Sequence, residues 1–184
     1  MPEPFAVFSQ GLAVYAQMVP AHRLLASEFL DFAATTPQAF ERAHRAGHFT
    51  GSAWLVSADG RRVLLTHHRK LDRWLQLGGH ADGDRDLAAV ALREAREESG
   101  LGQLRLEPGI FDLDRHLIPA RADEPAHWHY DVRYVVRTGG SEAFAGNEES
   151  LALAWRSIDA IAADGQADES LRRMALRWLA RGGH

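Results

Sequence analysis

The segment GGHADGDRDLAAVALREAREESGL, residues 78–101, joins a glycine-rich loop to a strongly patterned helix. Glu97 and Glu98 follow Glu94 at three and four residues, so a helix projects all three side chains toward one side. Like charges at such spacings cost roughly 0.2–0.5 kcal/mol per pair, and proximity to the carboxyl end of the helix adds a penalty from the helix dipole. The pattern therefore requires a compensating interaction.

Two interpretations of the acidic cluster are open from these residues alone. The first is a solvated helix face with ion pairs to Arg93 and Arg96, which is what a run of charges usually is. The second is a site for Mg²⁺ or a similar hard divalent cation, which prefers carboxylate oxygens and reverses the sign of the local electrostatics. The opposite side of the helix is apolar and is predicted to pack on a sheet through Leu87, Val90, Ala91 and Ala95.

The loop before the helix supplies the other half of the pattern. Gly78 and Gly79 allow the backbone to approach a ligand closely. Asp82 or Asp84 is predicted to cap the helix, and Gly100 is predicted to end it in the left-handed conformation. Such a loop is weak evidence alone, but at a fixed spacing from the acidic helix it becomes specific.

The segment resembles the signature of the Nudix hydrolases, in which a Gly is followed at fixed spacings by a Glu, then Arg-Glu, an apolar residue, Glu-Glu, Gly and an apolar residue. Gly79 opens the pattern here, and Arg85 stands where the first Glu is expected. The resemblance covers residues 48–184. The second half of the pattern is filled without a gap by Arg93, Glu94, Ala95, Glu97, Glu98, Gly100 and Leu101.

The resemblance implies a metal-dependent pyrophosphohydrolase that directs water onto a phosphoanhydride in a nucleoside diphosphate linked to another moiety. It implies Mg²⁺, with Mn²⁺ as an alternative, held by Glu94, Glu97, Glu98 and the backbone carbonyl of Gly78. We assign Glu98 or Glu97 as the carboxylate closest to the attacking water. Arg93 is expected to orient a neighbouring Glu, with a plain surface ion pair to Glu97 as the alternative. The chemistry agrees, because carboxylates anchor the cations that neutralise a pyrophosphate before water attacks phosphorus.

Further candidates for substrate binding come from two loops. Residues 67–74, HHRKLDRW, are the densest basic stretch of the chain, and Arg69 and Arg73 are its candidate phosphate contacts. An ordinary solvated loop is equally compatible with these charges. Glu148 and Glu149 are candidates by resemblance, because some Nudix hydrolases take an extra acid from a loop beyond the signature. Two solvated loop acids are the alternative interpretation of that pair.

Two later runs, residues 111–120 and 127–136, have strand character with polar residues at a period of two. We expect the polar faces of these strands to line one wall of an anion-binding cleft, with His129 and Arg133 as substrate contacts. A metal centre of His116, His127 and His129 is disfavoured, because histidines on strand faces usually bind no metal. The polar positions are Asp112, Asp114 and His116 on the first run, and His127, His129, Asp131 and Arg133 on the second.

Residues 1–46 are predicted to form an N-terminal helical segment packed on the core. The apolar positions Leu24, Leu25, Phe29 and Phe32 recur at helical spacing, and TTPQAFER, residues 35–42, is predicted to start a second helix with Pro in its first turn.

Residues 47–184 are predicted to form the Nudix hydrolase domain. Runs at 49–56 and 62–66 flank an ADG turn and predict a hairpin, and residues 168–182 predict an amphipathic helix. Alternation of helices and strands predicts an α/β fold, a Nudix-like α/β/α sandwich with a mixed β-sheet. The buried stripe of the last helix is predicted to be Leu171, Met174, Ala175 and Trp178.

The composition excludes several function classes. A hydrophobic content of 46% with 25% charged residues is typical of a globular protein, and a net charge of −4 argues against a nucleic-acid duplex as partner. The chain contains no Cys, which excludes thiolate catalysis and disulfides. No signal peptide or membrane span is recognisable, so we expect a cytoplasmic protein with a small nucleotide-type substrate and no membrane partner. A homodimer is compatible with the sequence.

The main alternative to an enzyme is a non-catalytic module that binds or senses nucleotides. The intact Arg93, Glu94, Glu97 and Glu98 favour the enzyme, whereas Arg85 is the one feature that favours the sensor. An isopentenyl diphosphate isomerase is disfavoured, because that chemistry resembles one that uses a Cys.

Overall fold

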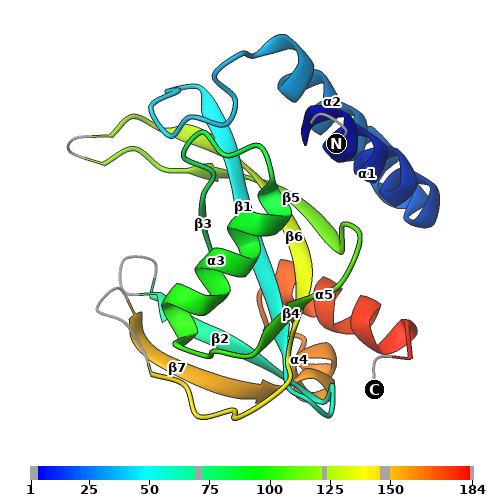
Figure 1. Cartoon of the computed structure of the whole chain (residues 1–184), viewed down its shortest axis with the longest axis vertical. Helices are drawn as coiled ribbons and strands as arrows, with labels where there is room; N and C mark the ends of the chain where they lie inside the picture. Colours follow the sequence, from blue (N-terminus) through cyan, green and yellow to red (C-terminus); the bar gives the residue numbers. More distant parts are fainter. Residues whose placement is uncertain (1–3, 69–71, 122–123, 146–149, 183–184) are drawn as a thin grey trace. The chain divides into compact units, whose positions relative to one another are not determined.

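The computed structural model describes residues 4–68, 72–121, 124–145 and 150–182 (Figure 1). The chain begins with α1 (Pro4–Met18), a 3-10 turn η1 (Pro20–His22) and α2 (Arg23–Thr35). The central elements are β1 (Gly47–Val56), β2 (Arg62–His68), β3 (Arg73–His80), α3 (Leu87–Ser99) and β4 (Leu104–Leu106). They are followed by β5 (Asp112–Ile118), β6 (His127–Thr138), β7 (Ser150–Ser157), α4 (Ile158–Ala163) and α5 (Glu169–Ala180). Among the described residues, no helix is both long and apolar enough to cross a membrane.

The strands pair in the order β4-β6-β1-β3-β2-β7, with β5 paired to β6 off this path. The predicted hairpin is confirmed: Val56 of β1 pairs with Val63 of β2, and Gly60 in the turn has a φ of 70°. Strands β5 and β6 are antiparallel neighbours, with His116 opposite His129. The predicted α/β fold with a mixed sheet is confirmed.

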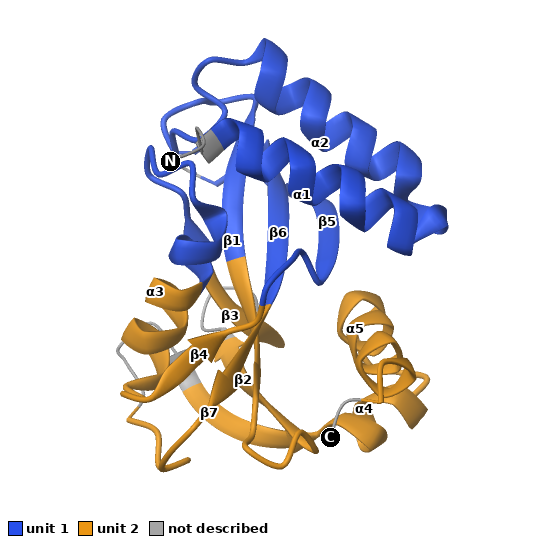
Figure 2. Cartoon of the chain, turned by 45° about the vertical axis from the view of Figure 1, so that its right-hand side comes forward, with its two compact units in different colours: residues 1–51, 79–91, 108–134 blue, residues 52–78, 92–107, 135–184 orange. Residues whose placement is uncertain are grey.

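The chain divides into two compact units (Figure 2). Unit 1 comprises residues 1–51, 79–91 and 108–134, and unit 2 comprises residues 52–78, 92–107 and 135–184. Residues 1–46, which were predicted to pack on the core, belong wholly to unit 1.

Unit 2 is built around strands that are buried on both faces. Val63, Leu64 and Leu65 are at most 2% exposed, although neighbours in a strand point to opposite sides. The carboxyl-terminal half of α3 covers one side and α4 with α5 the other (Figures 1 and 2). The cluster on the α3 side contains Ala53, Leu55, Leu64, Leu77, Ala95, Leu101, Leu104 and Val136.

Helix α5 follows the sequence prediction closely. Asp168 caps it by accepting hydrogen bonds from the N–H groups of Ser170 and Leu171. The indole N–H of Trp178 donates to the Gly60 carbonyl at 2.8 Å, which ties the helix to the hairpin turn. The predicted stripe of Leu171, Met174, Ala175 and Trp178 is buried throughout.

The N-terminal helices of unit 1 pack through aromatic rings onto Phe49 of β1. The rings of Phe8, Phe29 and Phe32 lie 5.4, 5.9 and 5.4 Å from the Phe49 ring, measured between centroids. Leu24, which was predicted to lie on the same apolar stripe, is 81% exposed. Helix α2 therefore uses a narrower face than the sequence pattern indicates.

The predicted helix at residues 35–42 is wrong. Helix α2 ends at Thr35, and the chain then makes turns in which the Ala39 N–H bonds the Thr36 carbonyl. The carbonyl of Ala39 in turn accepts from the Phe49 N–H at 2.8 Å. A continuing helix would need the Ala39 carbonyl as an acceptor within the helix, but this carbonyl bonds to β1 instead. Pairing with the sheet therefore overrides the local helix preference.

The predicted caps of α3 are half correct. Gly100 ends the helix with a φ of 69°, as expected for a left-handed cap. At the other end, however, neither Asp82 nor Asp84 caps the helix: Asp86 Oδ1 accepts from the Ala89 N–H at 3.0 Å. Asp84 instead accepts from the Asp86 N–H at 2.9 Å and so shapes the loop before the helix.

The interior of unit 1 contains one arginine among three aspartates. The Arg133 guanidinium lies 2.7 Å from Asp131, 3.2 Å from Asp112 and 3.3 Å from Asp114, and Arg133 is 2% exposed. Burial alone lowers the pKa of Arg133, but attraction to Asp131, Asp114 and Asp112 outweighs it and raises the pKa, so the cation persists. Thr50 adds a hydrogen bond to Asp131 at 2.9 Å.

We predict that Arg133→Met destabilises the fold by about 3–5 kcal/mol, because it leaves buried carboxylates without their counter-charge. The measurement is urea unfolding followed by circular dichroism. The matched control is Arg115→Met on β5, whose partner Glu28 is exposed and 2.9 Å away. The control is expected to cost at most about 1 kcal/mol. Equal losses in both variants would contradict the prediction.

Candidate active site

The end of β3 and the last turn of α3 bring Gly78 and Glu98 together inside unit 2. The N–H of Gly78, near the end of β3, donates a hydrogen bond to Glu98 Oε1 at 2.7 Å. Twenty residues separate these partners in sequence. The contact therefore fixes the last turn of α3 against the start of the glycine loop.

Gly78 is required here by close packing. A Cβ at this position would lie 2.3 Å from Ser52 Oγ and 2.8 Å from Ser52 Cβ, well inside van der Waals contact. Any larger residue would displace either β1 or the backbone N–H that binds Glu98. The sequence pattern predicted a close approach of the Gly78 backbone to a ligand, which stays a prediction, and it did not indicate the packing of Gly78 against Ser52.

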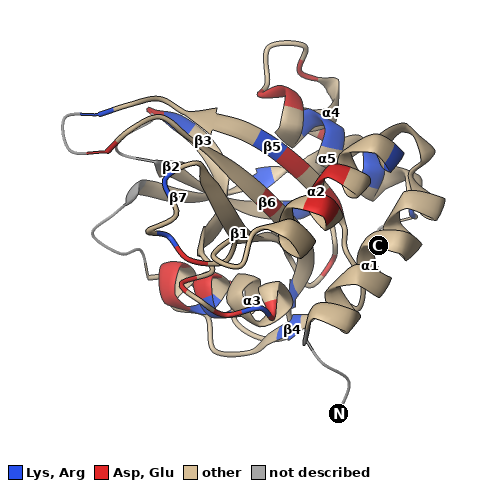
Figure 3. Cartoon of the chain, turned by 90° about the horizontal axis from the view of Figure 1, so that it is seen from above, with Lys and Arg blue, Asp and Glu red and all other residues tan. Residues whose placement is uncertain are grey.

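Arg93 interacts with the neighbouring carboxylate. Its Nη2 lies 3.2 Å from Glu94 Oε1, in a pair that is partly buried. The neighbouring carboxylate in this contact is Glu94, and the role of Arg93 in orienting a glutamate stays a prediction. Figure 3 shows the acidic and basic positions of α3 in red and blue.

The three signature glutamates differ in their exposure to solvent. Glu97 is exposed, whereas Glu94 and Glu98 are half-buried. Oxygen donors of this kind, together with the Gly78 carbonyl, match the preference of Mg²⁺ and Mn²⁺. The predicted apolar side of α3 is buried, since Leu87, Val90, Ala91 and Ala95 are each at most 2% exposed.

The donor atoms of the three glutamates do not converge in this conformation. Within the described residues, the group of three such side chains whose donor atoms lie within 4.8 Å of one another is His48, His80 and His129, all in unit 1. The sequence pattern pointed to His116 and His127 as the neighbours of His129 and disfavoured a metal centre there. It missed His48 and His80, because they lie on separate strands with no shared motif.

The remaining predicted substrate contacts have different surroundings. Arg73 is exposed, and its Nη1 lies 3.6 Å from Asp168 Oδ2. Arg133 belongs to the buried ion cluster, so we do not retain it as a substrate contact. Arg69, Glu148 and Glu149 lie outside the described residues.

Arg85, the departure from the signature, packs on the N-terminal segment. Its guanidinium carbon lies 5.5 Å from the centroid of the Phe40 ring, a cation–π geometry within unit 1. The arginine that stands in place of the first signature Glu therefore packs against Phe40.

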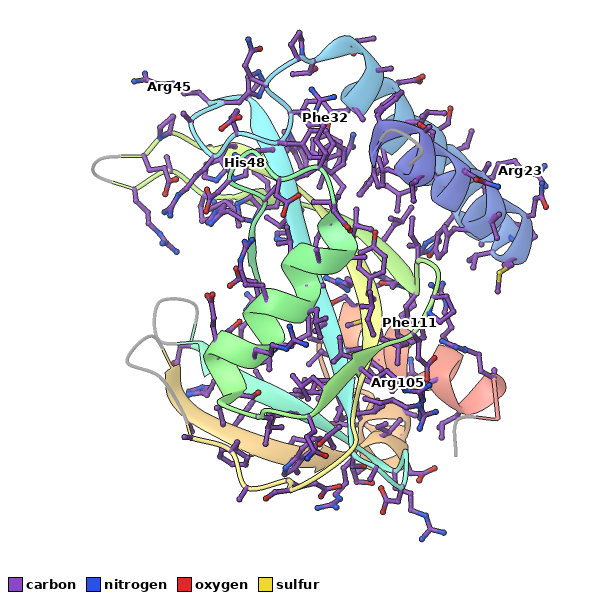
Figure 4. All side chains as sticks on the ribbon, viewed as in Figure 1. Arg23, Phe32, Arg45, His48, Arg105 and Phe111 are labelled. Carbon is purple, nitrogen blue, oxygen red and sulfur yellow. The ribbon has the colours of Figure 1, made fainter. Side chains whose placement is uncertain are left out.

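A hollow of about 520 Å³ in unit 2 lies among residues other than the signature. Two of its lining residues, Glu107 and Arg137, pair at 2.5 Å, and Arg181 approaches Glu107 at 2.9 Å. The charges of Glu107 and Arg137 are thus engaged with each other, and we do not place substrate there. The lining residues are Ala58, Arg105 (labelled in Figure 4), Glu107, Arg137, Thr138 and Gly139.

Comparison with known proteins adds family evidence to this geometry. A family model of the NUDIX domain matches residues 48–178. A NUDIX-family hydrolase from Clostridium perfringens matches with a TM-score of 0.58 and 26% identity, over 73% of this chain and 97% of that chain. No curated protein sequence matches the chain.

Two further solved structures share the fold at lower identity. A C. elegans Ap4A hydrolase in a binary complex matches with a TM-score of 0.57 and 14% identity, over 72% of this chain and 96% of that chain. A UDP-X diphosphatase matches with a TM-score of 0.53 and 16% identity, over 98% of this chain and 91% of that chain. This last likeness extends beyond residues 48–178.

The matched domain spans more than half of the chain and includes the whole of residues 78–101. Together with the related NUDIX-family hydrolase, it defines the enzyme class as a pyrophosphohydrolase acting on acid anhydrides. The chain belongs to the NUDIX domain family.

Proposed function

We propose that this protein hydrolyses a phosphoanhydride in a nucleoside diphosphate linked to another moiety, with water attacking phosphorus and Mg²⁺ or Mn²⁺ as cofactor. The observation that supports this most directly is the 2.7 Å hydrogen bond from Gly78 to Glu98, which joins the glycine loop to the acidic helix. We propose that residues 47–184 form the catalytic domain and that residues 1–46 pack on it.

Glu98 is the carboxylate best placed to handle a proton. One of its oxygens is held by the Gly78 N–H, so the orientation of the other is restricted. A carboxylate fixed in this way can accept the proton of an attacking water without a further entropic cost of side-chain ordering. Glu97, which is exposed, is the second candidate for this role.

Glu94, Glu97, Glu98 and the Gly78 carbonyl are the oxygen donors proposed to hold the cation. A bound divalent cation would neutralise the charge of the pyrophosphate and position the attacking water. Arg93 restrains Glu94 through the 3.2 Å contact and so limits the repulsion among the three acids.

The solved structures are named for different compounds. The Ap4A hydrolase and the UDP-X diphosphatase are 14% and 16% identical to this chain, so their likeness supports the fold and does not select a substrate. Arg73 and His129 stay as proposed substrate contacts. Arg69, Glu148 and Glu149 stay as predictions from sequence.

The second candidate function is a nucleotide sensor without turnover, which Arg85 favours. The position of Arg85 over Phe40 weakens that argument, because it gives the residue a packing role that is independent of catalysis. The intact Glu94, Glu97 and Glu98 continue to favour the enzyme.

We predict that the purified protein releases phosphate or a nucleoside monophosphate from at least one member of a panel of nucleoside diphosphate derivatives in the presence of Mg²⁺ or Mn²⁺. Chelation by EDTA is expected to abolish turnover, and excess Mg²⁺ to restore it, because the substrate charge must be neutralised. Chromatography of the products measures this and identifies the attacked phosphorus. Nucleotides that raise the melting temperature without any turnover would support the sensor instead.

We predict that Glu98→Gln lowers kcat by about 10²- to 10⁴-fold, because Gln retains the shape but cannot accept the proton. The melting temperature is expected to stay close to that of the wild type, since the amide oxygen can still accept from Gly78. Glu28→Gln, which removes a carboxylate exposed on α2, is the matched control and should retain full turnover. A Glu98→Gln enzyme with most of its activity would remove Glu98 from the catalytic role.

A further inference from the structure

Histidines from several strands gather inside unit 1, on residues that the proposed hydrolysis does not use as metal ligands. His48 lies in β1, His80 at the end of β3 and His129 in β6. Their ring centroids form a triangle with sides of 5.1 Å (His48–His80), 4.9 Å (His48–His129) and 5.3 Å (His80–His129). One nitrogen from each ring lies within 4.8 Å of the other two. Figure 4 labels His48 among the crowded side chains along the first part of β1.

His48 presents a buried nitrogen without a partner. Its side chain is 1% exposed, and Nε2 has no hydrogen-bond partner among the described residues. Its other nitrogen, Nδ1, lies 3.5 Å from the His44 carbonyl, which can only accept, so Nδ1 carries the proton and Nε2 the lone pair. An unsatisfied buried polar atom is costly, and bound metal is one way to satisfy it.

The hydrogen bonds around His129 fix its tautomer in the same way. His127 Nδ1 lies 2.9 Å from the Pro125 carbonyl, so this nitrogen donates and His127 Nε2 accepts. His129 Nε2 lies 3.2 Å from His127 Nε2 and must therefore be the donor. The lone pair of neutral His129 is left on Nδ1. Histidines that bind metals typically donate their other N–H to such an outer partner.

The rings of His48, His80 and His129 are neutral at physiological pH, and each therefore has a lone pair on one ring nitrogen. Burial, followed by repulsion from His48 and other histidines, lowers the pKa of His129 to about 2. Burial and repulsion from Arg42 and His48 lower the pKa of His80 to about 4, and burial also lowers the pKa of His48. Glu124 partly opposes this for His48 and His80.

We propose that His48, His80 and His129 form a binding site for a transition-metal dication, with Zn²⁺ as its occupant. Three neutral imidazoles suit Zn²⁺ and its neighbours in the first transition row, whereas Mg²⁺ prefers oxygen donors. Tetrahedral Zn²⁺ with Zn–N bonds of about 2.0–2.1 Å brings the nitrogens to about 3.3 Å from one another. The three nitrogens, which lie within 4.8 Å of one another, would have to move closer together to reach that spacing. The site goes beyond the proposed hydrolysis and does not rest on it.

The test is a zinc titration of the full-length protein after chelator treatment, in competition with a chromogenic chelator. We expect one Zn²⁺ per chain, and Co²⁺ in its place should give the visible absorption bands of a low-symmetry, four-coordinate site. His80→Gln and His129→Gln should each lower the affinity by at least about 10²-fold, since each removes a ligand. His127→Gln should cost about 10- to 100-fold through the tautomer of His129.

Two control variants distinguish the trio from neighbouring ligands. His116→Gln removes a histidine whose ring lies 5.5 Å from that of His129 but whose Nδ1 pairs with Asp114 at 2.9 Å, and it should change the affinity by less than about threefold. Glu98→Gln should leave zinc affinity unchanged, because Glu98 is not a member of the trio. Absence of zinc binding at micromolar concentrations, or equal affinity in wild type and the His80→Gln, His129→Gln double variant, would overturn the proposal. Loss of zinc in Glu98→Gln would do so as well, by moving the ion to the signature.

Discussion

The hydrogen bond from the Gly78 N–H to Glu98 Oε1 is the interaction on which the candidate active site depends. A hydrogen bond to a charged acceptor contributes roughly 1.5–3 kcal/mol, and the lower end suits an exposed backbone group such as Gly78. Repulsion between carboxylates one helical turn apart costs roughly 0.2–0.5 kcal/mol per pair. This one bond can therefore offset the repulsion that Glu98 experiences from Glu94, and the fold tolerates the acidic cluster before any cation is considered.

The same bond explains why the signature needs its glycine and its helix at a fixed spacing. Ser52 on β1 leaves no space for a Cβ at Gly78, so the backbone reaches Glu98 only because a glycine is present. Gly100 then ends the helix within two residues of Glu98 through a left-handed turn. Both glycines thus position the same carboxylate, one by close packing and one by backbone conformation.

Local patterns predicted the elements well and the long-range contacts poorly. The buried stripe of α5, the hairpin at Gly60 and the strand that contains His129 and Arg133 follow from periodicity and turn residues. The predicted helix at residues 35–42 failed, because the Ala39 carbonyl bonds Phe49 of β1. The cap of α3 was predicted at Asp82 or Asp84 and lies at Asp86, since several aspartates near the helix start are equivalent until the loop geometry selects one of them.

The candidate site shows the same division. Glu94, Glu97, Glu98 and Gly78 are recognisable because one continuous segment carries them, and their spacing is fixed by the helix. Arg133 was predicted as a substrate contact because the alternating strand pattern places it on a polar face. The pattern does not reveal that three aspartates already pair with its guanidinium. His48, His80 and His129 come from three strands, so only the sheet brings them together.

Unit 1 contains two kinds of buried basic group, an arginine that stays charged and histidines that stay neutral, and the difference affects metal binding. Arg133 keeps its charge because aspartates surround it, whereas the histidine trio loses protons because burial and mutual repulsion disfavour the cation. Neutral imidazole is the form that binds Zn²⁺, and carboxylate is the form that binds Mg²⁺. The chain thus carries two donor sets of different hardness, one of imidazole nitrogens and one of carboxylate oxygens. Three imidazole nitrogens bind Mg²⁺ poorly, so the magnesium proposed at the signature glutamates would not displace a zinc ion from the trio.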